Sequence, residues 1–187
     1  MRKAIQAFLI LLLVSTATFA QKNPKAEDIL RAAKAKATEQ NKAIFLIFGA
    51  SWCEACHQLD TFLALPDVSA ILNKYFVISE LTFGEGSAGH PEWDTPGADE
   101  LMLRYGGVSS SGTVGLPFIA LVDAKAKLIA NSIQPGKGKA PGAETGFPTE
   151  PGEIQWFLSI LQKAAPNLTE EELHKIQSGL QKAASSD

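Results

Sequence analysis

The order of its predicted elements places this sequence in the α/β class, with a central mixed β-sheet flanked by helices. Three observations predict this class. The apolar run AIFLIF, Ala43 to Phe48, has strand length and is hydrophobic throughout, which suits a central strand covered on both faces. A helical pattern from Cys53 and the strand-like run FVISELTF complete a βαβ unit. Farther on, two short strands joined by a turn precede a helix and make a ββα unit.

The remaining elements can be justified in order along the chain. Asn23-Pro24 is typical of a helix start, Pro66 interrupts the second helix, and Asp67 can cap its second piece. Thr169 and Glu172 have the spacing of a capping box and predict the start of a last helix. The expected helices cover residues 25–41, 53–72 with a break at Pro66, 98–105, 153–164 and a stretch from 169 on, and the expected strands cover 43–48, 76–83, 118–122 and 128–132.

The first 20 residues, MRKAIQAFLILLLVSTATFA, predict a secretory signal peptide. Arg2 and Lys3 give a positive start, an apolar run extends from Phe8 to Val14, and Thr18 and Ala20 supply small residues before the cleavage site. The apolar run is shorter than the roughly 20 residues that span a bilayer. We therefore expect cleavage after Ala20, no stable membrane insertion afterwards, and a location in the periplasm or outside the cell.

Composition and charge are those of one soluble globular domain. The chain has 187 residues, of which 45% are hydrophobic and 20% charged. Removing Arg2 and Lys3 from the 17 basic residues leaves 15 against 20 acidic residues, a net charge of −5. This acidic balance argues against a nucleic-acid or anionic-membrane partner.

The motif SWCEACH, residues 51–57, allows two interpretations. As C-x-x-C-H it is a haem attachment site, with Met102 or His90 as the distal ligand; as W-C-x-x-C it is a redox disulfide. The buried strand directly before the motif favours the disulfide, since the common cytochromes c are helical there. Met102 is then expected in the core, His90 in a loop and His57 on the surface of the helix.

A second motif carries a family resemblance. Trp52-Cys53-Glu54-Ala55-Cys56 at a strand-to-helix junction, with Gly115-Leu116-Pro117 before a later strand, resembles the thioredoxin superfamily. The pattern is most similar to secreted thioredoxin-like proteins and to the C-terminal domain of bacterial transmembrane disulfide reductases, and it covers residues 43–132. The resemblance implies a thioredoxin-like fold and a cis peptide bond at Pro117 facing the cysteines. We expect a thioredoxin-like domain over 21–165 and a C-terminal helical extension over 166–187.

Helix position predicts different roles for the two cysteines. Cys53 at the helix N-terminus meets unpaired N–H groups and the positive end of the helix dipole, which stabilise its thiolate. We therefore expect Cys53 to be the exposed nucleophile and Cys56 the resolving thiol. The Glu54 carboxylate raises the thiolate pKa and a protonated His57 lowers it, so both are expected pKa modulators. A raised thiolate pKa favours the disulfide, which points to a reductant.

One position departs from the family. Its members commonly carry a buried acid six residues before the first cysteine, where this chain has Ile47. Glu80, on the next parallel strand, is the candidate proton relay in its place. The alternative for Glu80 is a solvated residue near a strand end.

The leading hypothesis is a periplasmic or secreted thiol–disulfide oxidoreductase that acts on protein thiols and disulfides. Trp52, Leu116 and Pro117 would line its docking groove, an electron donor in the membrane or periplasm would supply it, and it would need no cofactor or metal. The alternative is a non-catalytic thioredoxin-fold module that binds Cu(I) or a partner protein. A c-type haem protein is the third hypothesis.

Two Gly/Pro-rich segments, 84–97 and 133–152, are expected to emerge at the same sheet edge as Cys53. Loops of this length without secondary structure are often functional. We expect them to wall the groove, with His90, Trp93 and Phe147 as contacts; the alternative is a pair of mobile surface insertions.

Overall fold

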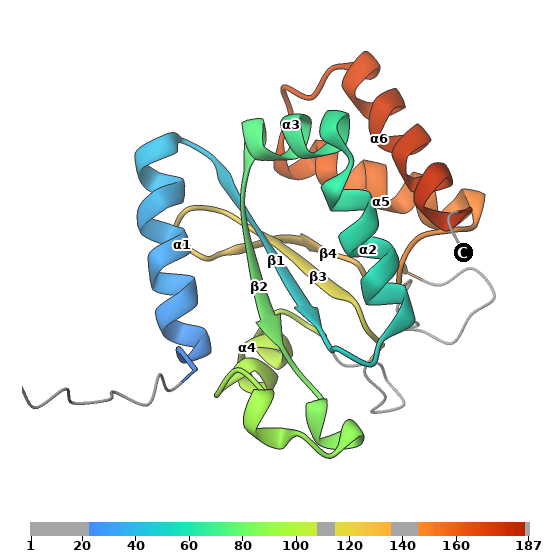
Figure 1. The fold of residues 1–187 in the computed structure, drawn as a ribbon. Helices are drawn as coiled ribbons and strands as arrows, with labels where there is room; N and C mark the ends of the chain where they lie inside the picture. The colour runs from blue at the N-terminus through green and yellow to red at the C-terminus, as the bar shows by residue number, and fades with distance from the viewer. Residues whose placement is uncertain (1–22, 108–114, 136–145, 186–187) are drawn as a thin grey trace, which may run out of the picture.

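The computed structural model describes residues 23–107, 115–135 and 146–185, so the expected signal peptide lies outside the described residues. Over the described residues the chain forms helices and a single sheet (Figure 1). The helices are α1 (Ala26–Gln40), α2 (Glu54–Ala64), α3 (Pro66–Tyr75), α4 (Ala98–Arg104), α5 (Pro151–Ala164) and α6 (Glu170–Ala184), with two 3₁₀ helices, η1 (Glu85–Ala88) and η2 (Pro91–Trp93). The strands are β1 (Ala43–Gly49), β2 (Phe76–Thr82), β3 (Phe118–Val122) and β4 (Leu128–Asn131).

The sheet has the order β2-β1-β3-β4 and confirms the mixed α/β class. β1 pairs in parallel with β2, from Ala43 opposite Phe76 to Gly49 opposite Thr82. β1 pairs antiparallel with β3, and β3 and β4 form the expected hairpin. The most apolar run of the sequence is therefore a central strand, and the carboxyl ends of β1 and β2 lie at one edge.

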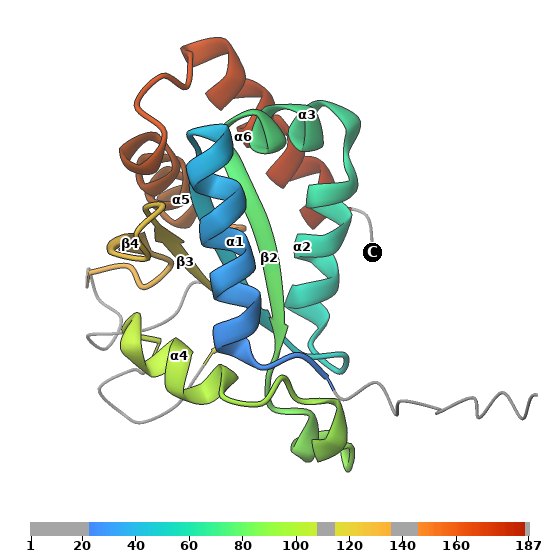
Figure 2. The same cartoon turned by 90° about the vertical axis from the view of Figure 1, so that its left-hand side faces the viewer.

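Alternate side chains of β1 belong to two separate cores. Phe45 and Ile47 pack against α2, α3, α5 and α6 on one face of the sheet. Ile44, Leu46 and Phe48 pack against α1 and α4 on the other face. Figures 1 and 2 show these helices as layers on either side of the sheet. All five side chains are almost fully buried, which explains the absence of any polar alternation in AIFLIF.

Three helix starts differ from the expectation, and one of them is that of α5, which begins at Pro151 and not at Glu153. The N-cap of α1 is Lys25, because the Asn23 side chain donates to the Glu92 carbonyl and Ala26 N donates to Pro96 O. Pro66 is the first residue of α3, with Leu65 as N-cap, so Asp67 lies inside the first turn and does not cap it. A proline at the first helical position loses no intrahelical bond, and this favours the earlier start.

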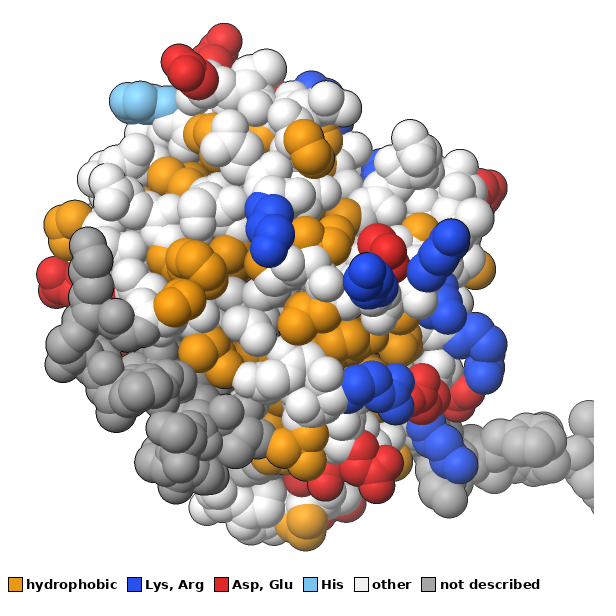
Figure 3. Space-filling model, turned by 180° about the vertical axis from the view of Figure 1, so that it is seen from behind, with side chains coloured by type: hydrophobic (Ala, Val, Ile, Leu, Met, Phe, Trp, Pro, Cys, Tyr) orange, Lys and Arg blue, Asp and Glu red, His pale blue; other side chains and the backbone are white. Residues whose placement is uncertain are grey.

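Seen from behind, the surface carries basic side chains along the side where α1 lies, with acidic ones among them (Figure 3). Arg31 pairs with Asp28 on α1, and Arg104 of α4 pairs with Glu27. A face with both signs differs from the basic stripe typical of nucleic-acid-binding proteins. No helix among the described residues is long and apolar enough to cross a membrane.

The helical extension packs outside α2 and α3. Ile176 and Leu180 of α6 are fully buried, and Gly179 lets the helix approach closely, since a Cβ there would lie 2.6 Å from Val68 Cγ2. The capping box of Thr169 and Glu172 is confirmed, with Glu172 N 3.2 Å from Thr169 Oγ1.

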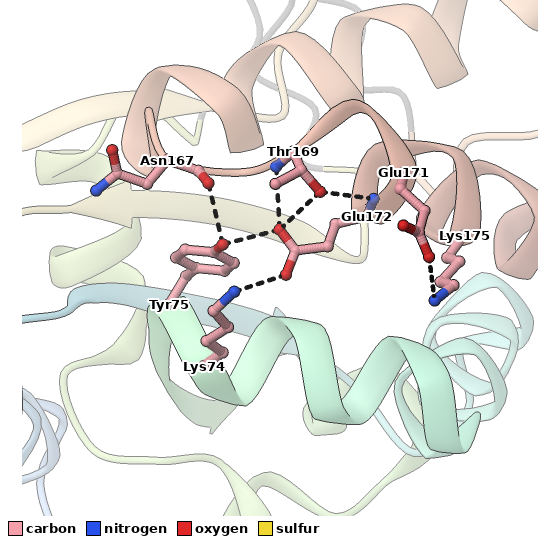
Figure 4. A network of polar contacts seen from close by, with 7 residues as sticks. All are labelled: Lys74, Tyr75, Asn167, Thr169, Glu171, Glu172 and Lys175. Atoms are coloured by element: carbon pink, nitrogen blue, oxygen red, sulfur yellow. Dashed lines mark hydrogen bonds and ion pairs between the residues drawn. The ribbon is translucent and has the colours of Figure 1, made fainter.

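The Glu172 carboxylate also ties α6 to α3 (Figure 4). It accepts hydrogen bonds from Lys74 Nζ at 2.8 Å and from Tyr75 Oη at 2.8 Å. The Lys74 bond, and then the bond from the Thr169 backbone, lower the pKa of Glu172 to about 2. The contacts therefore stabilise the fold only while this carboxyl is ionised.

Glu172→Gln should lower the melting temperature near pH 7 by about 2–4 °C, which corresponds to about 1 kcal/mol for a chain of this size. The lowered pKa means that this stabilisation is complete above about pH 4.5 and disappears as the pH falls toward 2. Melting curves between pH 7 and pH 2.5 should show the two proteins converging. The control is Glu170→Gln, because Glu170 is an exposed acid in the same turn that lies outside this network. A difference in melting temperature between Glu172→Gln and wild type that does not depend on pH would contradict the role given to the Glu172 carboxylate.

Candidate functional site

The cysteine pair lies at the junction between β1 and α2. Cys53 is the N-cap of α2 in an extended conformation, and Cys56 lies in the first turn. The two are joined by a disulfide with a Cα–Cα distance of 5.2 Å. The Cys56 backbone N–H donates to Cys53 Sγ at 3.2 Å, so this sulfur faces the unpaired N–H groups at the positive helix end.

Both cysteines are enclosed. Each is 6% exposed, and together with Ala50 they form a small apolar cluster against which Ala55 and Leu116 pack. The expectation that Cys53 is the more exposed thiol is therefore wrong for the disulfide form. What distinguishes Cys53 is its N-cap position, which brings an N–H group to its sulfur.

The segment before β3 forms the wall opposite the cysteines. The Leu116–Pro117 peptide bond is cis. Leu116 is half-buried against the cysteine cluster and Pro117 is buried. Gly146 approaches the same wall, since a Cβ there would lie 3.6 Å from the Leu116 carbonyl oxygen and 4.0 Å from Ala55 Cβ. Segments far apart in the sequence thus meet around the disulfide.

Ser51, two residues before Cys53, is held by all three of its polar groups. Its backbone N–H donates to Glu85 Oε1 at 2.6 Å, and its hydroxyl donates to Glu85 Oε2 at 2.7 Å. Its carbonyl oxygen lies 2.8 Å from His57 Nε2. Because a carbonyl only accepts, the His57 proton is on Nε2. The turn that leads into Cys53 is therefore fixed by two side chains from different elements.

The segment 84–97 contacts the motif, and it is not without structure because it contains η1 and η2. Trp52 is 49% exposed, and its Nε1–H donates to the Gly84 carbonyl at 2.9 Å. Trp93 is equally exposed, and the His90 ring stacks on it at 3.9 Å. Residues 136–145 of the segment 133–152 lie outside the described residues.

Phe147 does not take the position expected of a groove contact. It is 4% exposed and packs edge-to-face with Phe62 of α2, with the ring centroids 6.2 Å apart. The expectation was wrong because an aromatic residue in a Gly/Pro-rich segment was assigned to the loop surface. The segment returns into the core immediately before α5.

A cavity of about 330 Å³ opens beside Cys56. Glu80 lies opposite Ile47 in the β1–β2 register, and both side chains line this cavity. Asp60 of α2 lines it as well. Burial raises the pKa of the Glu80 carboxyl above its ordinary value, and the Asp60 carboxylate raises it further. The residue as a whole remains exposed, so the desolvation is partial. The rest of the lining includes Gly49, Ala50, Ser51, His57, Leu59, Glu85 and Trp93.

The two expected pKa modulators flank the cysteines on α2. Glu54 is exposed in the first turn, next to Cys53. His57 is also exposed, and its Nδ1 lies 3.9 Å from Asp60 Oδ2. That contact is an ion pair only when the imidazole is protonated.

The haem interpretation gains no support from the positions of its distal ligands. Met102 is 1% exposed in the core between the sheet, α1 and α4, and His90 stacks on Trp93. Within the part of the chain that the structure describes, no group of three or more His, Cys, Asp or Glu side chains could hold a metal ion.

Glu85 and Asp60 are the residues of the site that sequence reasoning missed. Glu85 stands in a Gly-rich segment where an acid is expected to be solvated, yet it is 1% exposed. Asp60 reads as a polar position on an amphipathic helix. The sequence did offer a signal for Glu85, because it is the second residue of the segment 84–97, which is expected beside Cys53.

A disulfide at the N-terminus of a helix, packed against Leu116 before β3 and placed at the edge of a four-stranded mixed sheet, is the arrangement of a thioredoxin-fold protein with a C-x-x-C site. Comparison with family models agrees, because a model described as "Thioredoxin-like" matches residues 25–124. The chain therefore belongs to the thioredoxin-like family. None of the curated proteins compared with it matches significantly.

Several solved structures resemble the chain. A disulphide isomerase from Xylella fastidiosa Temecula1 is 22% identical, with 64% of this chain and 79% of that chain covered and a TM-score of 0.45. A thioredoxin from Thermus thermophilus is 19% identical, with 76% and 85% covered and a TM-score of 0.43. The oxidised C-terminal domain of DsbD from Neisseria meningitidis is 20% identical, with 73% and 97% covered and a TM-score of 0.41. Similarity at this level says nothing about activity.

In the reduced protein, Cys53 should have the lower apparent pKa and react with iodoacetamide about tenfold faster than Cys56 near pH 7. The reason is the N–H group and dipole at the N-cap, not greater exposure. The single variants Cys53→Ser and Cys56→Ser isolate each thiol, and thiolate absorbance against pH gives each pKa. A lower pKa or a faster reaction at Cys56 would show that the two roles are reversed.

Proposed function

We propose that this protein is a thiol–disulfide oxidoreductase that reduces disulfides in protein substrates in the periplasm or outside the cell. The observation that carries the proposal is the Cys53–Cys56 disulfide at the N-terminus of α2, enclosed against Leu116. A structural staple would not need a helix N-terminus, whereas a reactive thiolate gains stability there.

The reaction proceeds by two exchanges. The Cys53 thiolate attacks one sulfur of a substrate disulfide, forms a mixed disulfide and releases the first substrate thiolate. The Cys56 thiolate then attacks Cys53 Sγ, which re-forms the Cys53–Cys56 disulfide and releases the second substrate thiol. The substrate gains two electrons and two protons. A dithiol electron donor in the membrane or periplasm returns the pair to its reduced form.

The docking surface consists of the side chains around the disulfide. Trp52 offers an exposed indole held in place by its bond to Gly84, and Leu116 offers a half-buried apolar side chain. Pro117 is buried and follows Leu116 through the cis peptide bond. An extended substrate segment alongside Leu116 would pair through its backbone, in the manner of strand addition.

Glu80 is the proposed acceptor for the Cys56 proton. It lines the same cavity as Cys56, on the strand adjacent to Ile47. A carboxyl whose pKa is raised above its ordinary value is a stronger base toward a thiol than an ordinary carboxylate. The cavity also gives the proton a route through water to the surface.

Cys56→Ser should trap covalent complexes of substrate proteins on Cys53, because the resolving thiol is absent. Complexes released by dithiothreitol on non-reducing gels are the readout, with wild type showing few. Cys53→Ser should trap none, and complexes formed on Cys56 in that variant would contradict the assigned order of attack.

Glu80→Gln should slow resolution by Cys56 at least about tenfold while attack by Cys53 changes little, since only the second step needs this base. Rapid-mixing experiments with a mixed-disulfide form separate the steps. The control is Glu92→Gln, because Glu92 is an exposed acid close to the site that does not line the cavity. Equal rates for Glu80→Gln and wild type in both steps would return Glu80 to a solvated surface role.

A further inference from the structure

Glu85 is a buried acid that the exchange steps do not use. Its side chain is 1% exposed, and its carboxylate accepts both hydrogen bonds from Ser51. Burying an ionised carboxyl is costly unless hydrogen bonds compensate it. Two short bonds from one residue next to the cysteine motif are such compensation. They attach the segment 84–97 to the motif at Ser51, in addition to the bond from Trp52 to Gly84.

The segment that carries Glu85 is fixed at its base. Thr82 N donates to Thr95 Oγ1 at 3.0 Å, and Thr95 N donates back to Thr82 O at 2.9 Å. Within the loop, Glu85 N donates to Asp94 Oδ1 at 3.0 Å. These bonds join the two ends of the segment just beyond the end of β2, and they hold Glu85 close to the sheet. A carboxylate held in this way can determine the position of its partner.

Ser51 passes this constraint on to the cysteines. It is followed directly by Trp52, which is bonded to Gly84, and by Cys53, the N-cap of α2. The Ser51 carbonyl accepts from His57 one turn into the same helix. The turn is thus clamped between the segment and the helix.

The Glu85 carboxylate also lines the cavity that Cys56 lines, so its negative charge faces the same cavity as this cysteine. The other charged or titratable groups around the redox pair are Glu54, His57 and Asp60 from α2, Glu80 from β2 and Asp94 from the segment. Among these groups only His57 can carry a positive charge, when its imidazole is protonated, and so offset the charge of the carboxylates. A fixed negative charge disfavours a nearby thiolate and so favours the disulfide over the dithiol.

We propose that Glu85 is a positioning residue of the redox site, which holds the Ser51–Cys53 turn at the N-terminus of α2 and biases the cysteine pair toward the disulfide. This inference rests on the proposed function and gives a cause for its reductant direction. The segment 84–97 is then a second support for the cysteines, independent of α2.

The test is Glu85→Gln, which preserves the volume and removes the charge. The equilibrium of the Cys53–Cys56 pair with glutathione should shift about tenfold toward the dithiol, which corresponds to a potential about 30 mV more positive. The apparent pKa of Cys53 should fall in parallel. Glu92→Gln, in the same segment but with its carboxyl bonded to His90, should change neither value. An unchanged potential in a folded Glu85→Gln variant would overturn the proposal.

Ser51→Ala is the second variant, and it removes one of the two bonds while leaving the charge. It should slow attack by Cys53 on a small disulfide, and its effect should be non-additive with that of Glu85→Gln, since both act on one interaction. Additive effects would overturn the positioning role. An unchanged rate in Ser51→Ala would overturn it as well, and this measurement can be made even if Glu85→Gln does not fold. The reduction potential is measured without turnover of a substrate. A wild-type protein without reductase activity would therefore refute the proposed function, while the test of Glu85 could still be interpreted.

Discussion

The parallel pairing of β1 with β2 determines where the chemistry of this protein lies. Because Gly49 pairs with Thr82, the chain leaves both strands at one edge of the sheet. The first exit leads to Cys53 and α2, and the second to Glu85 and the segment 84–97. The bond from Phe83 N to Gly49 O extends this pairing one step beyond the strands. The contacts between motif and segment all depend on this register, and a slip of one residue would separate them.

The central position of β1 explains how so small a sheet supports a rigid site. Each face of the strand belongs to its own core, so the strand cannot shift toward one layer without opening the other. Gly49 and Ala50 then leave room behind the disulfide, since a Cβ on Gly49 would lie 3.4 Å from Cys56 Sγ. Large residues hold the strand and small ones accommodate the sulfur atoms.

Local patterns in the sequence were sufficient for most of the fold and for the centre of the site. AIFLIF, the W-C-x-x-C motif and the Thr169 capping box each determine structure through neighbours in the chain, so their predictions were right. Phe147 was misjudged and Glu85 was missed because their burial depends on where a long segment returns to the fold. No local pattern contains that information. Likewise, the equal burial of Cys53 and Cys56 results from Leu116, which is distant in sequence.

The packing of α6 has a consequence for the extent of the hydrophobic core. Ile176 and Leu180 share one core with Phe62 of α2 and Val68 of α3, so the extension completes the hydrophobic layer behind the redox helix. Gly179 lies so close to Val68 of α3 that a Cβ there would come within 2.6 Å of its Cγ2. The C-terminal helix therefore shares its hydrophobic core with the thioredoxin-like part of the chain. A polypeptide shortened before Thr169 would leave the outer side of α2 as an uncovered apolar surface.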